Sequence, residues 1–351
     1  MEELRVDAYS PTEIAKKVAA VAQKKSGLDS FRLFVLAILA GAFISLGAEF
    51  YTLVVHDSRL AFGLNKLVGG FVFSLGLILV VLAGAELFTG NTLMVMGFVD
   101  GIINTRGLLR SWAIAYMGNF VGSLALVLLM YSTRQWTFNN AMVGGKALLI
   151  ANAKINLTFV EAFGRGILCN VLVCLAVWLC FGARSTTDKI LAIIFPITAF
   201  VASGFEHCVA NMYFVPMGII LKGKATVVAA AEAMAGKQVV LTNLTTSGFL
   251  VSNLLPVTLG NIVGGSLFVG LVYWSIYLRE FSFQSLLRMI QIAFRLIFLL
   301  SPRDLTPSRI AANVSGFYAF LSRRKEKRPP LPRDLTTLWD DPSGEEEETK
   351  D

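Results

Sequence analysis

The stretch that decides the fold is GAELFTGN at residues 84–91, which returns in altered form as GFEHCVAN at residues 204–211. Both copies follow the pattern G-x-E-x4-N, and both stand in the middle of a long apolar segment. A carboxylate or an amide left unpaired in hydrocarbon costs several kcal/mol, so polar groups inside a membrane span usually mark a transport route. Two copies of the same interruption predict a transporter built from two repeats, whose broken helices meet near the bilayer midplane.

The composition places the chain in a membrane. Of its 351 residues, 55% are hydrophobic and 16% are charged, whereas soluble domains carry about 25% charged residues. The mean hydropathy is +0.65. The net charge of +7 comes from basic residues in the predicted loops and tail, which favours contact with the anionic lipid of a bilayer over binding of nucleic acid.

Six apolar stretches reach the length of about 20 residues that a membrane-spanning helix needs. The second and the fifth are too long for one simple helix and carry the repeated motif, so each is expected to be two half-helices joined by a bend. Six spans place both ends of the chain on the same side of the membrane. The approximate ranges are 33–55, 67–98, 108–131, 158–181, 188–220 and 250–278.

A second pair of motifs extends the repeat. GNFVG at residues 118–122 and GNIVG at residues 260–264 share the pattern G-N-x-V-G, and each follows its own G-x-E motif. Their glycines permit close helix approach. Because each repeat has three spans, an odd number, the two halves must run in opposite directions across the membrane. The sequence therefore predicts an all-α polytopic membrane protein with six transmembrane helices in a 3+3 inverted repeat.

Basic residues set the expected orientation. The N-terminal segment, the second and fourth connections and the stretch after the last span are rich in Lys and Arg, which places both termini in the cytoplasm and the protein in the inner (plasma) membrane. The opposite face also carries lysines, among them Lys146 and Lys237. The expected organisation is a cytoplasmic amphipathic segment (1–30), a transmembrane transporter domain (31–280), an interfacial amphipathic helix (281–300) and a disordered charged cytoplasmic tail (301–351).

His207, in the second motif, is the main candidate for chemistry. An imidazole has an unperturbed pKa of about 6.5, so it can give a proton to a passing anion or donate a hydrogen bond to it. The alternative is a structural histidine held by its neighbours; the symmetric motif around His207 favours the functional reading. Glu86 and Glu206 occupy equivalent positions, which predicts that each carboxylate binds backbone groups freed at its own helix break. A proton relay through Glu206 is the second reading of that residue.

Other polar residues stand near the breaks. Asn170 and Asn261 lie within the fourth and sixth spans, where an amide can bind a small oxyanion or an imidazole, or can join two helices. Thr89 either bonds to a helix carbonyl or faces the passage. Lys154 precedes the fourth span, where it is an ordinary solvated lysine or concentrates anions at the mouth.

Apolar residues near the breaks have two readings as well. Each of these residues taken alone is typical of a packed core. Together they can form hydrophobic constrictions that exclude hydrated ions by dewetting. The four cysteines contain no C-x-x-C pair and read as buried free thiols, so no metal site and no cofactor is expected. The apolar residues in question are Phe73, Leu77, Leu87, Phe88 and Phe200.

These motifs, in this order, resemble the formate/nitrite transporter family and in particular its formate-channel branch. The similarity runs from about residue 10 to residue 280. The resemblance implies an aquaporin-like protomer and a homopentamer with one pore in each protomer. The matching stretches are LVGG (67–70), FSLGL (73–77), GAELFT (84–89), NVLVCLAVW (170–178), FVASGFEH (200–207) and PVTLGN (256–261).

The resemblance also implies roles for individual residues. His207 would be the central histidine of the pore, and Lys154 would lie in the outer vestibule. Further pore residues would be Thr89, Asn170 and Asn261; the outer constriction would consist of Phe73, Leu77 and Phe200, and the inner one would involve Leu87, Phe88 and Val173.

A monovalent anion in an apolar bore meets a desolvation cost of tens of kcal/mol. We therefore expect Lys154 and the positive ends of the half-helices to gather a small weak-acid anion, formate first, which takes up a proton near His207 and crosses as the neutral acid. Two sources of the proton are compatible with the sequence: His207 itself, or a relay of water.

Rival readings differ in substrate or in class. Nitrite, hydrosulfide or another small monocarboxylate would suit the same architecture. A water or glycerol channel is disfavoured because the paired Asn-Pro-Ala motifs of aquaporins are absent. A membrane-embedded enzyme would need several converging ligands or a nucleophile with its base, and one intramembrane histidine does not supply them, so the sequence predicts a transporter without catalytic residues.

Overall fold

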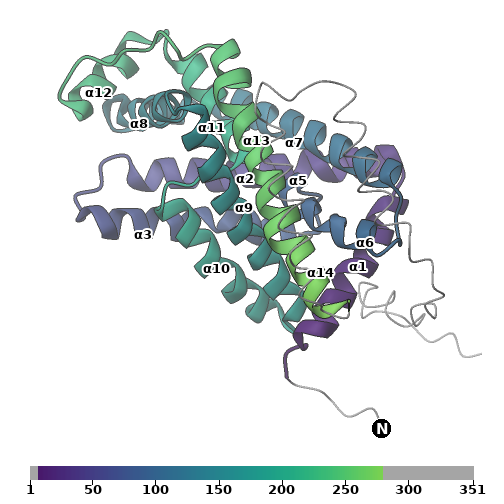
Figure 1. Cartoon of the computed structure of the whole chain (residues 1–351). Helices are drawn as coiled ribbons and strands as arrows, with labels where there is room; N and C mark the ends of the chain where they lie inside the picture. Colours follow the sequence, from purple (N-terminus) through teal and green to yellow (C-terminus); the bar gives the residue numbers. More distant parts are fainter. Residues whose placement is uncertain (1–6, 280–351) are drawn as a thin grey trace, which may run out of the picture. The chain divides into compact units, whose positions relative to one another are not determined.

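The computed structural model describes residues 7–279, and these fold into an assembly of helices (Figure 1). The interfacial helix expected at 281–300 and the tail expected at 301–351 lie outside the described residues. The first half of the described chain contains α1 (Pro11–Gly27), α2 (Ser30–Val55), α3 (Phe62–Phe73), α4 (Leu75–Leu82), α5 (Phe88–Asn91), η1 (Thr92–Met94), α6 (Val95–Val99) and α7 (Thr105–Thr133).

The second half repeats this order. A long continuous helix over Gly248–Tyr277 closes it, and two stretches of that helix have the wider π-helical turn. The elements are η2 (Gln135–Thr137), α8 (Phe138–Ile155), α9 (Phe159–Gly182), α10 (Thr186–Ala202), α11 (Cys208–Leu221), α12 (Ala225–Ala235), η3 (Gly248–Leu254), α13 (Leu255–Ile262), η4 (Val263–Leu271) and α14 (Val272–Tyr277).

The prediction of two broken helices is confirmed. The chain leaves the helical conformation after α4 and again after α10, and at each break the glycine of the G-x-E motif turns the backbone with a positive φ, 76° at Gly84 and 71° at Gly204. Glycine is the residue that adopts this left-handed conformation without steric cost. The first break is not central, because α3 and α4 together form a predominantly apolar stretch of 21 residues, enough to span a bilayer before the break is reached.

Five helices of the described chain are long and apolar enough to cross a membrane, and a sixth is obtained if α11 and α12, bent by 113°, count as one span. Two helices of the second half were not expected from the sequence. These are α8 and α12, which lie together at one end of the molecule in Figure 1, whereas α1 lies near the opposite end. We call these two ends the α8 end and the α1 end.

The two halves are built from the same helix contacts. In the first half, Gly122 of α7 lies so close to the Ile38 carbonyl of α2 that a Cβ would collide with it; in the second half, Gly264 of η4 meets the Ile167 carbonyl of α9 in the same way. The glycines of the G-N-x-V-G motifs thus let one helix in each half approach the backbone of another, as the small-residue pattern predicts.

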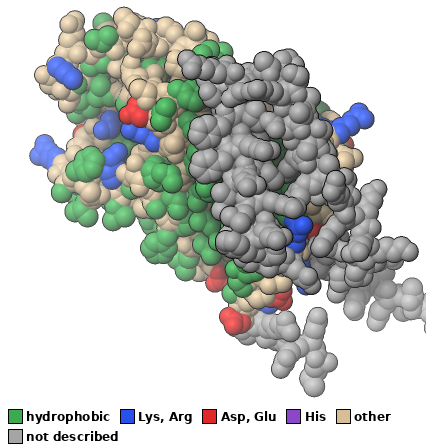
Figure 2. All heavy atoms as spheres, viewed as in Figure 1, with side chains coloured by type: hydrophobic (Ala, Val, Ile, Leu, Met, Phe, Trp, Pro, Cys, Tyr) green, Lys and Arg blue, Asp and Glu red, His purple; other side chains and the backbone are tan. Residues whose placement is uncertain are grey.

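The surface in view carries apolar side chains over α3 and α10, and Lys and Arg side chains gather at the α8 end (Figure 2). Large apolar residues are strongly exposed on these two helices, including Phe71 at 56% and Phe195 at 75%. Apolar surface of this extent marks a membrane or protein contact surface.

Gly122→Ala is expected to lower the free energy of unfolding by about 3 kcal/mol, because the added methyl group collides with backbone and α2 and α7 must separate. Gly164→Ala, in α9, is the matched control, since a Cβ there meets no atom within 4 Å. Thermal unfolding of the detergent-solubilised protein measures both. Equal unfolding temperatures for the two variants would contradict the close α2–α7 contact.

Candidate functional site

The first break is fixed by an ion pair and two hydrogen bonds. Lys25 of α1 donates from Nζ to Glu86 Oε2 at 2.8 Å and to Asn91 Oδ1 at 2.7 Å. The Asn91 amide donates to the same Glu86 oxygen at 2.8 Å. We call Lys25, Glu86 and Asn91 the first ion-pair network; its carboxylate is bound by two side chains, so the sequence-based prediction that it binds freed backbone groups was wrong.

The second break has the equivalent network, formed by Lys154, Glu206 and Asn211. Lys154, the last basic residue of α8, donates from Nζ to Glu206 Oε1 at 2.9 Å, and the Asn211 amide donates to Oε2 at 2.7 Å. Asn211 Oδ1 has no partner within the described residues, so this lysine, unlike Lys25, binds only the carboxylate. Buried carboxylates are stable in an apolar interior when they are paired in this way.

Asn261 holds the backbone at the second break. Its amide donates to the Gly166 carbonyl at 2.8 Å and to the Glu206 carbonyl at 3.0 Å, and its Oδ1 accepts from the Cys208 amide at 2.9 Å. Both amide hydrogens and the oxygen are therefore used inside the protein. This is the helix-joining role that the sequence analysis gave as one reading of Asn261.

Asn119 plays the same part at the first break. It donates to the carbonyls of Ala37 and Glu86 at 2.8 and 3.0 Å and accepts from the Phe88 amide at 2.9 Å. The Phe88 ring packs edge-to-face against Tyr116 of α7, with 4.9 Å between ring centroids. Backbone groups freed at each break are thus bound by an asparagine from a G-N-x-V-G motif, which satisfies them without water.

His207 caps the N-terminus of α11. Its Nδ1 accepts from the Ala210 amide at 3.1 Å, and its Nε2 lies 2.9 Å from Thr89 Oγ1 in the first break. A ring nitrogen that accepts from a backbone N–H carries no proton, so the neutral ring carries its proton on Nε2 and donates it to Thr89. The imidazole is 3% exposed and stacks on Phe200, with 6.0 Å between centroids.

Asn170 orients Thr89 rather than His207. Its amide lies 2.6 Å from the Asn261 carbonyl, 3.1 Å from Thr92 Oγ1 and 3.3 Å from the Thr89 carbonyl. Thr92 also donates to the Thr89 carbonyl, at 2.7 Å. The partner of the histidine is therefore held on its backbone side by a polar cluster from three helices, which leaves its hydroxyl directed at the imidazole.

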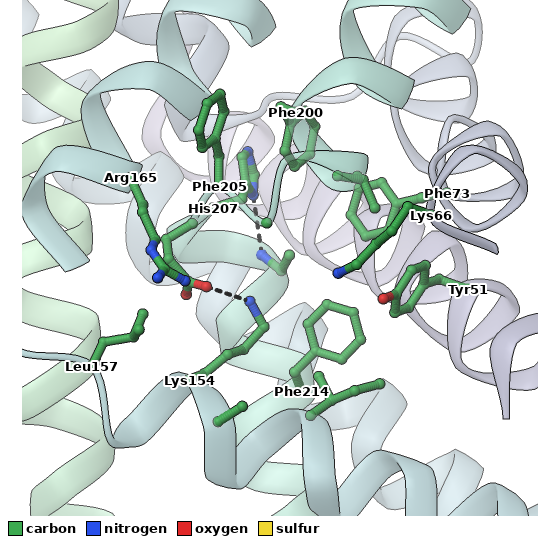
Figure 3. A pocket seen from close by; sticks show the side chains of 16 residues that line it. Tyr51, Lys66, Phe73, Lys154, Leu157, Arg165, Phe200, Phe205, His207 and Phe214 are labelled. Atoms are coloured by element: carbon green, nitrogen blue, oxygen red, sulfur yellow. Dashed lines mark hydrogen bonds and ion pairs between the residues drawn. The ribbon is translucent and has the colours of Figure 1, made fainter. Parts of the chain in front are cut away.

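A cavity of about 200 Å³ lies at the α8 end and reaches His207. Figure 3 shows His207 beside Phe200, with Phe73, Phe214 and Lys154 around the same space. Phe73 packs edge-to-face on Phe200, with 5.6 Å between centroids. Lys154, the aromatic rings and the imidazole thus line one partly open cavity.

The predicted site residues divide into two groups. Those that line this cavity are Lys154, Glu206, His207, Phe73 and Phe200. Those that are buried and do not line it are Thr89, Asn170, Asn261, Leu77, Leu87, Phe88 and Val173.

Sequence reasoning missed further lining residues, among them the polar or aromatic Tyr51, Lys66, Arg165 and Phe214. The signal for two of them was present, because Lys66 directly precedes the apolar stretch 67–98 and Arg165 is a basic residue within the stretch 158–181. Lys25 belongs to the basic N-terminal segment that indicates the orientation, and its pairing with Glu86, 61 residues away, could not be read from the sequence.

Comparison with known proteins identifies the architecture. A family model described as "Formate/nitrite transporter" matches residues 12–275. The formate channel FocA of Escherichia coli strain K12 is 43% identical over 280 residues, which cover 78% of this chain and 96% of that protein. FocA of Haemophilus influenzae is 44% identical over 264 residues, 75% of this chain and 93% of that one.

Solved structures agree with the sequence relatives. A structure described as "Pentameric formate channel with formate bound" has a TM-score of 0.65 and 46% identity, and covers 71% of this chain and 98% of its own. The aquaporin-like, all-helical fold and the absence of an enzymatic function follow from these relationships. The chain is therefore a member of the formate/nitrite transporter family.

Proposed function

We propose that this protein moves formate across the membrane through the cavity that reaches His207, with a proton accompanying the anion. The observation that carries the proposal is the placement of an imidazole beside the Phe200 ring, which packs on Phe73, in a cavity that Lys154 also lines. Formate is preferred to nitrite or hydrosulfide because the relatives named above, which match over nearly their whole length, are formate channels.

Lys154 is the residue that gathers the anion. An ammonium group has three donors, and Lys154 uses one on Glu206 and leaves Asn211 Oδ1 unbound. Its side chain is 15% exposed and its Nζ lies 5.3 Å from the centroid of the Phe214 ring, which also lines the cavity. A free donor in a partly desolvated space attracts an anion more strongly than the same group in water.

His207 then acts on the anion through Nε2. Thr89 accepts the Nε2 proton in the resting protein, and a formate oxygen is a stronger acceptor because it is charged. Giving this proton away would leave an imidazolate, so proton transfer from the ring needs prior protonation at Nδ1, which breaks the Ala210 bond. We therefore assign His207 as the hydrogen-bond donor that holds the anion. The proton comes from the solution at the α8 end and is relayed to the anion through cavity water, which is left unchanged. The neutral acid then avoids the desolvation cost that a bare anion meets in the apolar part of the route.

The oligomeric state and the orientation in the membrane are the remaining parts of the proposed function. We infer a homopentamer, as in the related formate-bound structure, with exposed faces such as that around Phe195 covered by neighbouring protomers or by lipid. The basic N-terminal segment favours an inner-membrane protein with cytoplasmic termini, so the α8 end would face outward. Leu77, Leu87 and Val173 remain proposed constriction residues beyond the cavity.

Uptake by proteoliposomes tests the substrate. We expect stopped-flow swelling to be fastest in formate, slower in nitrite and hydrosulfide, and at the rate of empty vesicles in glycerol. Preference for nitrite or hydrosulfide would replace the substrate within the family, whereas glycerol selectivity would replace the proposed anion transporter with a neutral-solute channel.

His207→Phe is expected to abolish formate-driven acidification of the vesicle interior, because the ring that holds the anion for protonation is lost. A pH-sensitive dye trapped in the vesicles measures it. His56→Phe is the matched control, since His56 is the other histidine of the chain and does not line the cavity. Unchanged acidification by His207→Phe would refute the role of the imidazole.

Lys154→Gln and Lys25→Gln separate anion binding from structure. Both substitutions leave a buried carboxylate unpaired and are expected to lower the unfolding temperature to a similar extent. Lys154→Gln alone is expected to raise the KM for formate added at the α8 end, by about tenfold for the loss of one ionic contact. Lys154→Arg should restore the KM, and equal KM values for the two glutamine variants would show that Lys154 is structural only.

A further inference from the structure

Two cations of the cavity take no part in the proposed transport route. Lys66 of α3 and Arg165 of α9 line the same cavity as Lys154 and His207. Figure 3 shows them on opposite sides of the cavity, with both side chains extending toward it. The site therefore has a second pair of donors, separate from the ion-pair network that holds the helix break.

The charges of the cavity do not cancel. Its lining contains three cations and one carboxylate, and that carboxylate, Glu206, is already bound by Lys154 and Asn211. Within residues 7–279, Lys66 has no carboxylate at ion-pair distance. The one carboxylate that Arg165 reaches in this described part of the chain is that of Glu161, at 4.0 Å, and these side chains are 42% and 50% exposed. With a neutral His207 the lining keeps a charge of +2.

The positive groups are close enough to repel one another. Lys66, Lys154 and Arg165 line one cavity of about 200 Å³, so their like charges face the same small volume. Repulsion between like charges grows as water is excluded around them. An arrangement of this kind is stabilised when an anion of matching charge enters.

We propose that Lys66 and Arg165 form a binding site for a small dianion, either a dicarboxylate or a sulfate-like oxyanion. A planar guanidinium matches the two oxygens of a carboxylate or a sulfate, and an ammonium on the opposite wall binds the second charge. A volume of about 200 Å³ holds such an anion together with water.

The dianion is held at this site and is not carried further. One proton leaves it charged, so it still meets the desolvation cost of the apolar route beyond the aromatic rings. While bound, it occupies the cavity that His207 lines and so excludes formate from it. The binding site stands on geometry alone; the block rests on the proposed transport function.

Binding is tested on the purified full-length protein. Malonate is expected to raise the unfolding temperature above that in acetate at equal ionic strength, because a ligand that binds the folded state stabilises it. Arg165→Gln and Lys66→Gln should remove this difference. Lys224→Gln should keep it, since Lys224 loses the same charge, at the start of α12, without lining the cavity. No difference between malonate and acetate in the native protein, or an equal loss in Lys224→Gln, would overturn the site.

The block is tested by formate uptake into proteoliposomes with external malonate or sulfate. The concentration for half-inhibition is expected to be at least tenfold higher in Arg165→Gln than in the native protein and unchanged in Lys224→Gln. Equal inhibition of all three proteins, or uptake of malonate itself, would overturn the block. If malonate binds in an Arg165-dependent way while the native protein moves no formate, the transport proposal fails and the dianion site stands.

Discussion

Pairing of two buried carboxylates is the interaction on which the structure depends. Glu86 and Glu206 stand at the points where helices stop inside an apolar assembly. Each is bound by a lysine from a helix outside the broken span and by an asparagine five positions further on. Without the lysine, each break would expose a charge to hydrocarbon at a cost that no packing contact offsets. With it, the chain can turn at two places inside the membrane and bring two short helices together.

The residues that hold the two helix breaks are equivalent in the two halves, whereas His207 and Thr89 of the candidate site are not. The lysine, glutamate and asparagine of each network are equivalent in the two halves, and so are Asn119 and Asn261. At the positions between them the halves differ. His207 stands where the first motif has Leu87, and Thr89 stands where the second has Val209, so the imidazole–hydroxyl bond joins one unique residue from each half.

The two broken helices and the repeat could be predicted from the sequence, because polar groups that interrupt apolar segments are a local signal. It could not predict the partners of those groups, since Lys154 lies 52 residues from Glu206 and Thr89 lies 118 from His207. α8 escaped prediction for another reason. It begins with a left-handed backbone at 139–141 and carries Lys146 and Lys154, so its composition reads as a connecting loop.

Chain order adds a consequence for how the protein enters its membrane. In both halves the lysine precedes the carboxylate that it binds: Lys25 is synthesised before Glu86, and Lys154 before Glu206. A ribosome delivers residues from the N-terminus, so each acidic break reaches the bilayer after its counter-charge already exists. Loss of α1 by an alternative start site would leave Glu86 to insert without Lys25. Insertion of the protein into its membrane therefore depends on α1, a helix that lies outside every apolar segment.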